Sequence, residues 1–430
     1  MTIIHHKIIR SSELLPQLHA MPHGADIWEV ARILGLDDPH SILDFSSNLC
    51  PYSMARIYQQ WQDSQAASSQ NSIDAKAAGK ESINEDAMGP ASVTHKFIDA
   101  KAFDLNSYAQ DLEIYPPATY PDLTQALQEH FGGQAPEVLL GNGAAQLIYQ
   151  VFSSLMVAKR KSSLHVLVAA PAFSEYLRAA EAFQADLTLA PFTEDSLEDF
   201  LATLRQGTFD LVILVNPNNP TGIVWPRTAL AQVLQLAQKK GAQVLVDECF
   251  VPFLTEKRRR EVTCLPLLEA YPNQLLILRS FTKLFRLAGL RLGCLLAYSG
   301  PLAESIRRQT PAWVISALSA KLGILALRLY AQGAYEPYLR ELEEERARLK
   351  KALQSLGLKN ITGEANFVAF SSPRGEETLL DLLSDRDQPI FLRSCANYEG
   401  LDPSYYRAAI KTPTENTLLI QALKASFWRA

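Results

Sequence analysis

Short apolar runs alternate with amphipathic stretches between residues 107 and 300, and this alternation constrains the fold more than any other feature of the chain. The apolar runs have the length of buried strands. They occupy residues 137–141, 164–171, 209–217, 242–248, 274–280 and 292–298. Residues 144–157 and 227–241 instead repeat apolar side chains at helical spacing. Strands separated by helices predict an α/β fold whose central sheet is mainly parallel and covered by helices on both faces.

The chain of 430 residues is too long for one compact core, so we expect more than one domain. Residues 107–300 are predicted to form a large domain. Residues 301–430 combine long helical patterns with strand-like runs and predict a linking helix and a smaller α+β domain. Residues 1–53 are expected to supply an N-terminal arm and part of that small domain.

Residues 54–106 are predicted to be an atypical, partly flexible insertion. Its central part, residues 64–97, is rich in Ser, Ala, Asn, Gln and Lys and has few large apolar side chains. Such a segment buries too little surface to offset the entropy lost on ordering. A poor surface helix over part of the stretch is the alternative.

Overall composition excludes several functional classes. The net charge of -5 argues against a generally basic nucleic-acid-binding protein. The five cysteines include no CxxC pair, which disfavours a metal site and a disulfide framework. No apolar run approaches the roughly 20 residues of a membrane span, and the first residues do not resemble a signal peptide. We therefore expect a cytoplasmic protein without membrane contact.

A glycine turn follows the first predicted strand, in the sequence "LLGNGAAQLIYQ". The helix start behind it would expose backbone N–H groups at a positive helix terminus, which suits a phosphate. A dinucleotide fingerprint is disfavoured, because its third glycine is replaced by Gln146 and no ribose-binding carboxylate follows about 20 residues later. The remaining alternative is an ordinary tight turn.

Polar side chains also follow other predicted strands, at the edge where open α/β folds bind ligands. Asp247 ends a buried strand, where a carboxylate requires a cation or a protonated nitrogen as partner. A helix cap or a structural salt bridge is the alternative for Asp247. Asn219 lies between prolines after another strand, which favours a positioned side chain over a turn former.

Lys283 lies where a further strand ends, just after the hydroxyl residues Ser280 and Thr282. A lysine at a ligand-binding edge can form a Schiff base with a carbonyl, and an acidic partner for the ring nitrogen is the recurrent pattern in pyridoxal phosphate sites. Ser280, Thr282 and Arg291 could all reach the phosphate. The alternative for Lys283 alone is an ordinary surface lysine.

The ordered motifs "NPNNPTG", "VDE", "SFTK" and "AGLRLG" resemble the fold-type I pyridoxal-phosphate enzymes of the class I/II aminotransferase superfamily. The resemblance covers nearly the whole chain outside residues 54–106. It implies pyridoxal 5′-phosphate as cofactor and a large domain with a mainly parallel sheet plus a smaller α+β domain. By the same resemblance, Lys283 is the catalytic Schiff-base lysine, Asp247 pairs with the ring nitrogen, and Asn219 hydrogen-bonds the 3′-oxygen.

The resemblance assigns further residues to the cofactor. Phe173 in "PAFSEY" would stack on the ring. The phosphate would be held by the backbone around Gly143, Ala144 and Ala145, together with Ser280, Thr282 and Arg291. Tyr115 matches a tyrosine that reaches the phosphate of the neighbouring subunit, which implies a homodimer.

The segments "HGADIWEVARILGL", "ILDFSSNLCPY" and "LRSCANYEGLDPSYYRAAI" narrow the resemblance to the threonine-phosphate decarboxylases of the cobalamin pathway. That resemblance implies decarboxylation of L-threonine O-3-phosphate to (R)-1-amino-2-propanol O-2-phosphate. His23, Asn48, Arg393 and Arg407 would bind the phosphorylated amino acid, with Arg407 taking its carboxylate. Cations suit a substrate that carries both a carboxylate and a phosphate. For His23, a residue at the entry to a helix is the alternative.

Two positions depart from the decarboxylase pattern: Ser316 replaces an expected asparagine, and "LCPY" replaces the usual turn after "DFSSN". Histidinol-phosphate aminotransferase is the closest alternative, because it shares the cofactor residues and takes a phosphorylated amine. L-serine O-phosphate is an alternative substrate, since one methyl group discriminates by only about 1 to 3 kcal/mol. A non-catalytic cofactor-binding module is the alternative from another functional class.

Overall fold

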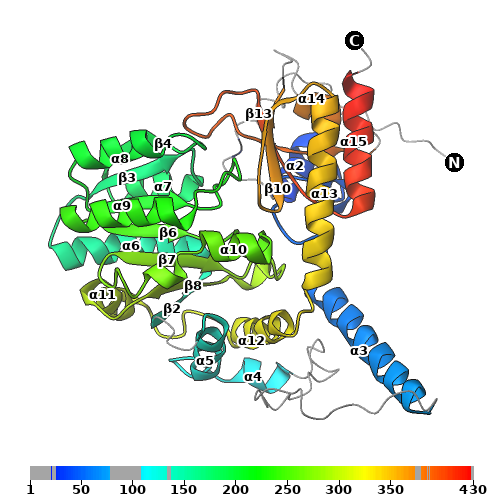
Figure 1. Ribbon diagram of the computed structural model, residues 1–430, viewed down its shortest axis with the longest axis horizontal. Coiled ribbons are helices and arrows are strands. Elements are labelled where there is room, and N and C mark those ends of the chain that lie inside the picture. Colours follow the sequence, from blue (N-terminus) through cyan, green and yellow to red (C-terminus); the bar gives the residue numbers. More distant parts are fainter. Residues whose placement is uncertain are drawn as a thin grey trace.

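The computed structural model describes residue 21, residues 26–77, 108–132, 137–372 and 379–384, residue 386 and residues 388–427. Its largest element is a seven-stranded sheet in the order β2-β8-β7-β6-β5-β3-β4 (Figure 1). The strands are β2 (Glu137–Asn142), β3 (His165–Ala170), β4 (Asp186–Pro191), β5 (Leu211–Val215), β6 (Gln243–Asp247), β7 (Leu275–Ser280) and β8 (Leu292–Ala297). Strand β8 is antiparallel to both neighbours, and the other pairs are parallel. The prediction of a mainly parallel sheet is confirmed.

Each apolar run that the sequence analysis assigned to this sheet forms one of its strands, but β4 was missed. Strand β4 lies at the edge, and its residues Leu187 and Leu189 are exposed to 37% each. An edge strand covered on one side alternates apolar and polar residues and lacks the continuous apolar run of a central strand. Central β5, in contrast, is buried at every residue.

Helices cover this sheet in separate layers. They are α5 (Pro121–His130), α6 (Gly143–Lys159), α7 (Ser174–Ala182), α8 (Leu197–Gln206), α9 (Arg227–Lys240), α10 (Glu256–Val262) and α11 (Pro301–Gln309). Helix α6 contacts α7 and α11, whereas α8 contacts α9. Helix α10 contains the basic run "EKRRRE".

A second part of the chain contains a four-stranded antiparallel sheet in the order β12-β13-β10-β9. Its strands are β9 (Lys359–Thr362), β10 (Phe367–Ser371), β12 (Arg393–Ser394) and β13 (Tyr405–Ala409). Strand β1 (Leu43–Asp44) pairs in parallel with β11 (Ile390–Phe391), so a segment of the N-terminal arm lies in this smaller part. The predicted domain boundaries stay a proposal.

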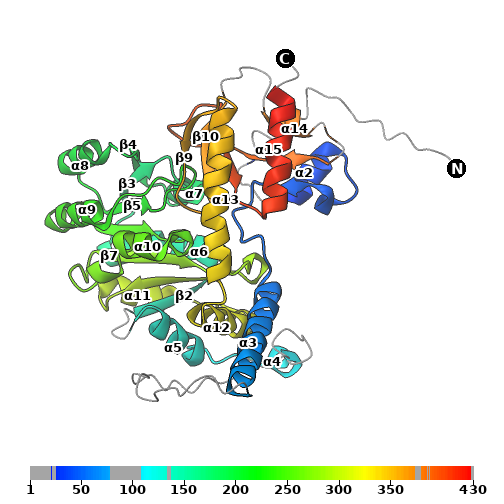
Figure 2. The same ribbon diagram turned by 45° about the vertical axis from the view of Figure 1, so that its right-hand side comes forward.

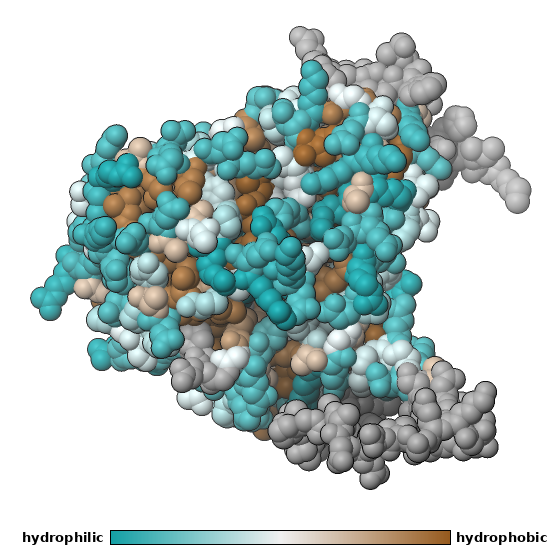
Figure 3. Space-filling view, in the orientation of Figure 1, coloured by the Kyte–Doolittle hydropathy of each residue, from teal (hydrophilic) through white to brown (hydrophobic). Residues whose placement is uncertain are grey.

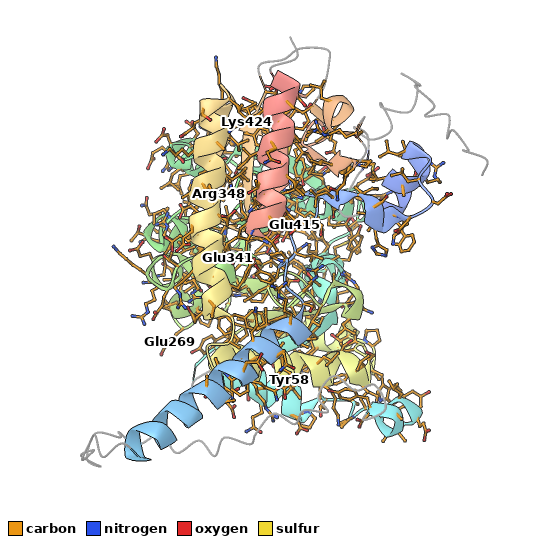
Figure 4. All side chains as sticks on the ribbon, turned by 90° about the vertical axis from the view of Figure 1, so that its right-hand side faces the viewer. Tyr58, Glu269, Glu341, Arg348, Glu415 and Lys424 are labelled. Carbon is orange, nitrogen blue, oxygen red and sulfur yellow. The ribbon has the colours of Figure 1, made fainter. Side chains whose placement is uncertain are left out.

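Six further helices lie around the smaller sheet or beside α5 (Figure 1). They are α2 (Ile27–Leu34), α4 (Ala109–Glu113), α12 (Ala317–Ala331), α13 (Glu336–Ser355), α14 (Leu379–Ser384) and α15 (Pro413–Phe427). Helices α13 and α15 lie side by side, and Figure 4 shows Arg348 and Glu415 on them. Asn416 Nδ2 donates to Glu345 Oε2 at 2.8 Å between the two helices.

Helix α3 (Met54–Ala77) projects away from the rest of the molecule (Figures 1, 2 and 4). Its first turns carry buried Met54, Ile57 and Tyr58, whereas residues 63–67 are exposed. The flexible segment predicted from residue 64 is therefore helical as far as Ala77, as the alternative reading proposed. Residues 78–107 lie outside the described residues.

The face shown in Figure 3 is mostly hydrophilic, with small separate apolar areas. Within the part of the chain that the structure describes, no helix is long and apolar enough to cross a membrane. All five cysteines are unpaired and buried. No group of three or more His, Cys, Asp and Glu side chains in the described ranges is arranged to hold a metal ion.

The larger and smaller parts meet tightly at a glycine contact. Gly222, in the "NPNNPTG" loop, has φ +66°, and a Cβ atom there would lie 2.5 Å from the Cα atom of Gly363. Glu364 N donates to Gly222 O at 2.9 Å, and Thr362 Oγ1 donates to Thr221 O at 2.7 Å. A side chain at position 222 would push the two parts of the molecule apart.

We predict that Gly222→Ala destabilises the protein more than Gly241→Ala. Both glycines have a positive φ, but a Cβ atom at Gly241 meets nothing within 4 Å. Gly241→Ala should cost only the left-handed backbone strain of about 1–2 kcal/mol, whereas Gly222→Ala should add about 1–3 kcal/mol of overpacking. The midpoints of urea unfolding measure the difference, and equal midpoints would contradict the tight contact.

Candidate active site

A cavity of about 440 Å³ lies where the carboxyl ends of the large-sheet strands face the smaller part of the molecule. It is lined by Ser46, Ser47, Asn48, Ala145, Phe173, Glu175, Arg178, Asn219, Lys283, Arg291, Tyr398 and Arg407. The lining thus combines the N-terminal arm, the loops after the parallel strands and strand β13. Its volume falls within the range of small-molecule sites.

Lys283 lies in the loop after β7, with its side chain in this cavity. Its backbone carbonyl accepts from Cys50 N at 3.0 Å, so the loop is held by the "LCPY" turn. Burial, together with the positive charges of Arg407 and Arg291, lowers the pKa of the Lys283 amine from 10.5 to about 8. A larger fraction of the amine is therefore neutral near pH 7, which makes it a better nucleophile.

Asp247 ends β6 and is 5% exposed. Tyr176 Oη donates to its Oδ2 at 2.8 Å, and Cys249 N donates to its Oδ1 at 2.9 Å. Burial and the neighbouring Asp247 raise the pKa of Tyr176 well above its usual value, so this phenol stays a donor. No Asp247 salt bridge exists within the described ranges. A buried carboxylate that accepts from neutral donors can form an ion pair with the protonated ring nitrogen of a cofactor.

The start of α6 and the ends of β7 and β8 form a cradle of donors. Gly143 has φ +77°, and a Cβ atom there would lie 2.5 Å from Arg291 Nη2. The hydroxyls of Ser280 and Thr282 lie 2.7 Å apart at the end of β7. Helix-terminal N–H groups with hydroxyls and a guanidinium fit a phosphate, so the cradle accommodates the phosphate of a cofactor.

The glycine on β8 makes this cradle compact. A Cβ atom at Gly293 would lie 2.8 Å from Ala144 N and 3.2 Å from Arg279 O. Gly293 also pairs with Ser280 across the sheet. The backbone around Ala144 can therefore approach β8 closely only because residue 293 lacks a side chain.

Arg407 reaches the cavity from β13 and is 5% exposed. It donates through Nη1 to Asn219 Oδ1 and through Nη2 to Ser46 O, the latter at 2.7 Å. Its Nε atom is buried without a hydrogen-bond partner among the described residues. No carboxylate of those residues forms a salt bridge with Arg407, so a ligand carboxylate suits this buried charge.

The other predicted substrate residues occupy different places. Asn48 lines the cavity and has a buried Oδ1 atom without a partner in the described part of the chain. Arg393 is 2% exposed and does not line the cavity; it donates to Met21 O at 2.7 Å, and its guanidinium lies 5.2 Å from the ring centroid of cavity-lining Tyr398. His23 lies outside the described residues. Substrate binding by these residues stays a prediction.

Tyr115 does not line this cavity within one chain. Its ring is 77% exposed, and its centroid lies 4.6 Å from that of Trp313. It lines a smaller pocket of about 110 Å³ between α4, α5 and α12.

Three residues of α7 were not among the predicted site residues: Glu175, Tyr176 and Arg178. Tyr176 is fully buried against Asp247, while Glu175 and Arg178 line the cavity. The first half of α7 reads "SEYLR", and nothing in that local pattern separates an active-site helix from an ordinary surface helix. The signal available was its position, directly after the predicted ring-stacking residue Phe173.

The sequence profile of the family described as "Aminotransferase class I and II" matches residues 84–423, and the chain belongs to this family. It is a pyridoxal 5′-phosphate-dependent enzyme, and the donor set described above fits that cofactor. A threonine-phosphate decarboxylase from Salmonella typhimurium is 31% identical over 94% of this chain and 95% of that protein. A histidinol-phosphate aminotransferase from Desulfitobacterium hafniense is 29% identical over 72% of this chain and 82% of that protein.

The fold is similarly shared. The crystal structure of a histidinol-phosphate aminotransferase from Clostridium acetobutylicum superposes with a TM-score of 0.68 and is 26% identical. The superposition covers 77% of this chain and 96% of the aminotransferase chain. The fold-type I architecture expected from the motifs is confirmed.

We predict that covalent capture of pyridoxal phosphate by the apoprotein increases with pH around a midpoint near 8, because only the neutral Lys283 amine reacts. Arg407→Gln should move this midpoint upward, since loss of a neighbouring positive charge favours the protonated lysine. The measurement is the fraction of protein that carries the cofactor after borohydride reduction, by mass spectrometry across pH 6–10. A midpoint near 10.5 in the unsubstituted protein would contradict the prediction.

Proposed function

We propose that this enzyme decarboxylates L-threonine O-3-phosphate to (R)-1-amino-2-propanol O-2-phosphate, for cobalamin biosynthesis. The observation that carries the proposal is the extent of similarity to a threonine-phosphate decarboxylase, over 407 residues and 95% of that protein. The similarity to a histidinol-phosphate aminotransferase extends over 318 residues and 72% of this chain. The similarity to that decarboxylase therefore covers more of this chain than the similarity to that aminotransferase does.

The charges of the cavity support a substrate with two anionic groups. Arg178, Lys283, Arg291 and Arg407 line it, with Glu175 as the carboxylate. Arg291 lies over the phosphate cradle at Gly143, so it serves the cofactor. Arg407 is buried with an unpaired Nε atom and would bind the substrate carboxylate.

The cofactor, when bound, provides an electron sink for the bonding pair that remains when CO₂ leaves the substrate. The Asp247 carboxylate, fixed by Tyr176 and the backbone of Cys249, would hold the ring nitrogen in its protonated form. Lys283 would then deliver a proton to the substrate Cα atom as a general acid. With its pKa near 8, the Lys283 ammonium can release that proton close to neutral pH.

We predict CO₂ and amino-propanol phosphate as products when the holoenzyme receives L-threonine O-3-phosphate without a keto acid. Lys283→Ala should reduce the rate by about 10²-fold or more, because it removes both the attachment point and the proton donor. The measurement is CO₂ release with product analysis, and L-serine O-phosphate is the comparison substrate. Glutamate formed from 2-oxoglutarate and histidinol phosphate, without CO₂ release, would replace the proposal with the aminotransferase function.

The proposed active unit is a homodimer. Exposed large apolar side chains gather around α4 and the turn before α12, at Leu112, Ile114, Tyr115 and Trp313. Apolar groups gathered on a surface favour a protein interface. In such a dimer, Tyr115 would reach the phosphate cradle of the neighbouring subunit.

We predict that mixed dimers of Lys283→Ala and Tyr115→Ala chains recover activity at limiting cofactor. Each mixed dimer would contain one site with both Lys283 and Tyr115, so an equal mixture should restore about one quarter of the sites. Activity after co-refolding, compared with each variant refolded alone, measures this. No recovery in a mixture that forms dimers would show that Tyr115 and Lys283 do not act in a shared site.

A further inference from the structure

Helix α7 carries a charged pair into the active-site cavity that the proposed mechanism does not use. Glu175 and Arg178 both line the cavity, and Arg178 Nη1 donates to Glu175 Oε1 at 3.1 Å. The Glu175 side chain is only 12% exposed, whereas that of Arg178 is 55% exposed. The pair therefore places a guanidinium where the cavity meets solvent.

The other cations of the cavity have assigned partners. Arg291 lies against the phosphate cradle at Gly143. Arg407 is held by Asn219 and Ser46 and suits a carboxylate. Lys283 is the attachment point of the cofactor. Arg178 is the further cation among the described residues that line the cavity, and it lies toward solvent.

The sequence analysis expected Arg393 to be the second cation for the substrate. In the structure Arg393 donates to Met21 O and Asn397 Oδ1, and its guanidinium lies 5.2 Å from the ring centroid of Tyr398. Arg393 is not among the described residues that line the cavity, whereas Tyr398 is. Arg178, in contrast, lines that cavity directly.

We propose that Arg178 binds the phosphate monoester of the substrate and that Glu175 positions its guanidinium. This inference rests on the proposed function, because it takes the substrate to be a phosphorylated amino acid. A guanidinium has five N–H donors in a planar fork, so pairing with Glu175 is compatible with binding a second anion. Arg178 thereby determines specificity for a phosphorylated over an unphosphorylated amino acid.

The experiment separates the two anionic groups of the substrate. The holoenzyme is titrated with L-threonine, which has the carboxylate alone, and with 1-amino-2-propanol O-2-phosphate, which has the phosphate alone. Binding is followed by the change in cofactor absorbance. Arg178→Gln should weaken the phosphate ligand by about tenfold or more and leave L-threonine within about twofold, because only the charge-assisted contact to phosphate is lost. Arg178→Lys should retain part of the phosphate affinity.

Arg308→Gln is the matched control. Arg308 also pairs with a glutamate of its own helix, Glu304, at 2.8 Å and is exposed, but it does not line the cavity. It should leave both affinities unchanged. The cofactor content of each variant, measured by absorbance, should equal that of the unsubstituted enzyme.

The other outcomes separate the role of Arg178 from the proposed function. Equal weakening of both ligands would make Arg178 a structural residue, and loss of cofactor would assign it to the cofactor phosphate. Unchanged affinity for the phosphate ligand, in an enzyme that releases CO₂, would overturn the role of Arg178 and keep the proposed function. Selective loss of phosphate affinity, in an enzyme that releases no CO₂, would keep the role of Arg178 and reject the decarboxylase.

Discussion

The buried guanidinium of Arg407 is the interaction on which the active site depends. It comes from β13 of the smaller part and donates to Asn219 of the larger part and to Ser46 of the N-terminal arm. A buried charge without a carboxylate partner is costly, so these hydrogen bonds are what make its position tolerable. The same charge lowers the pKa of Lys283. One side chain therefore joins three parts of the chain at the cavity and also lowers the pKa of the lysine there.

A second buried charge fixes the strand ends that carry the chemistry. Glu248, directly after Asp247, is fully buried and pairs with Arg279, directly before Ser280, at 2.5 Å. Thr263 Oγ1 donates to the same carboxylate at 2.8 Å. This pair joins β6 to β7 at the level of the cofactor residues. A supporting layer of this kind keeps the groups in front of it in register.

The central strands and the residues at their ends could be predicted because parallel strands buried on both faces leave continuous apolar runs. Asp247 and Lys283 follow such runs, so their convergence follows from the topology. The position of Arg393 could not be predicted, because its partners Met21 and Tyr398 depend on tertiary packing. Glu175 and Arg178 were missed because their pattern is local and common. An i, i+3 ion pair is typical of any exposed helix and does not indicate an active site.

Helix α7 shows why a local sequence pattern does not reveal which residues of a helix are functional. Its successive residues face different partners, because a helix turns by about 100° per residue. Tyr176 faces Asp247, whereas Glu175 and Arg178 face the cavity next to Phe173. One short helix thus contacts the carboxylate proposed to pair with the ring nitrogen and also presents the proposed phosphate-binding arginine. The hydroxyl of Tyr176 and the guanidinium of Arg178 are therefore placed by the same two turns of helix, one against Asp247 and one in the cavity.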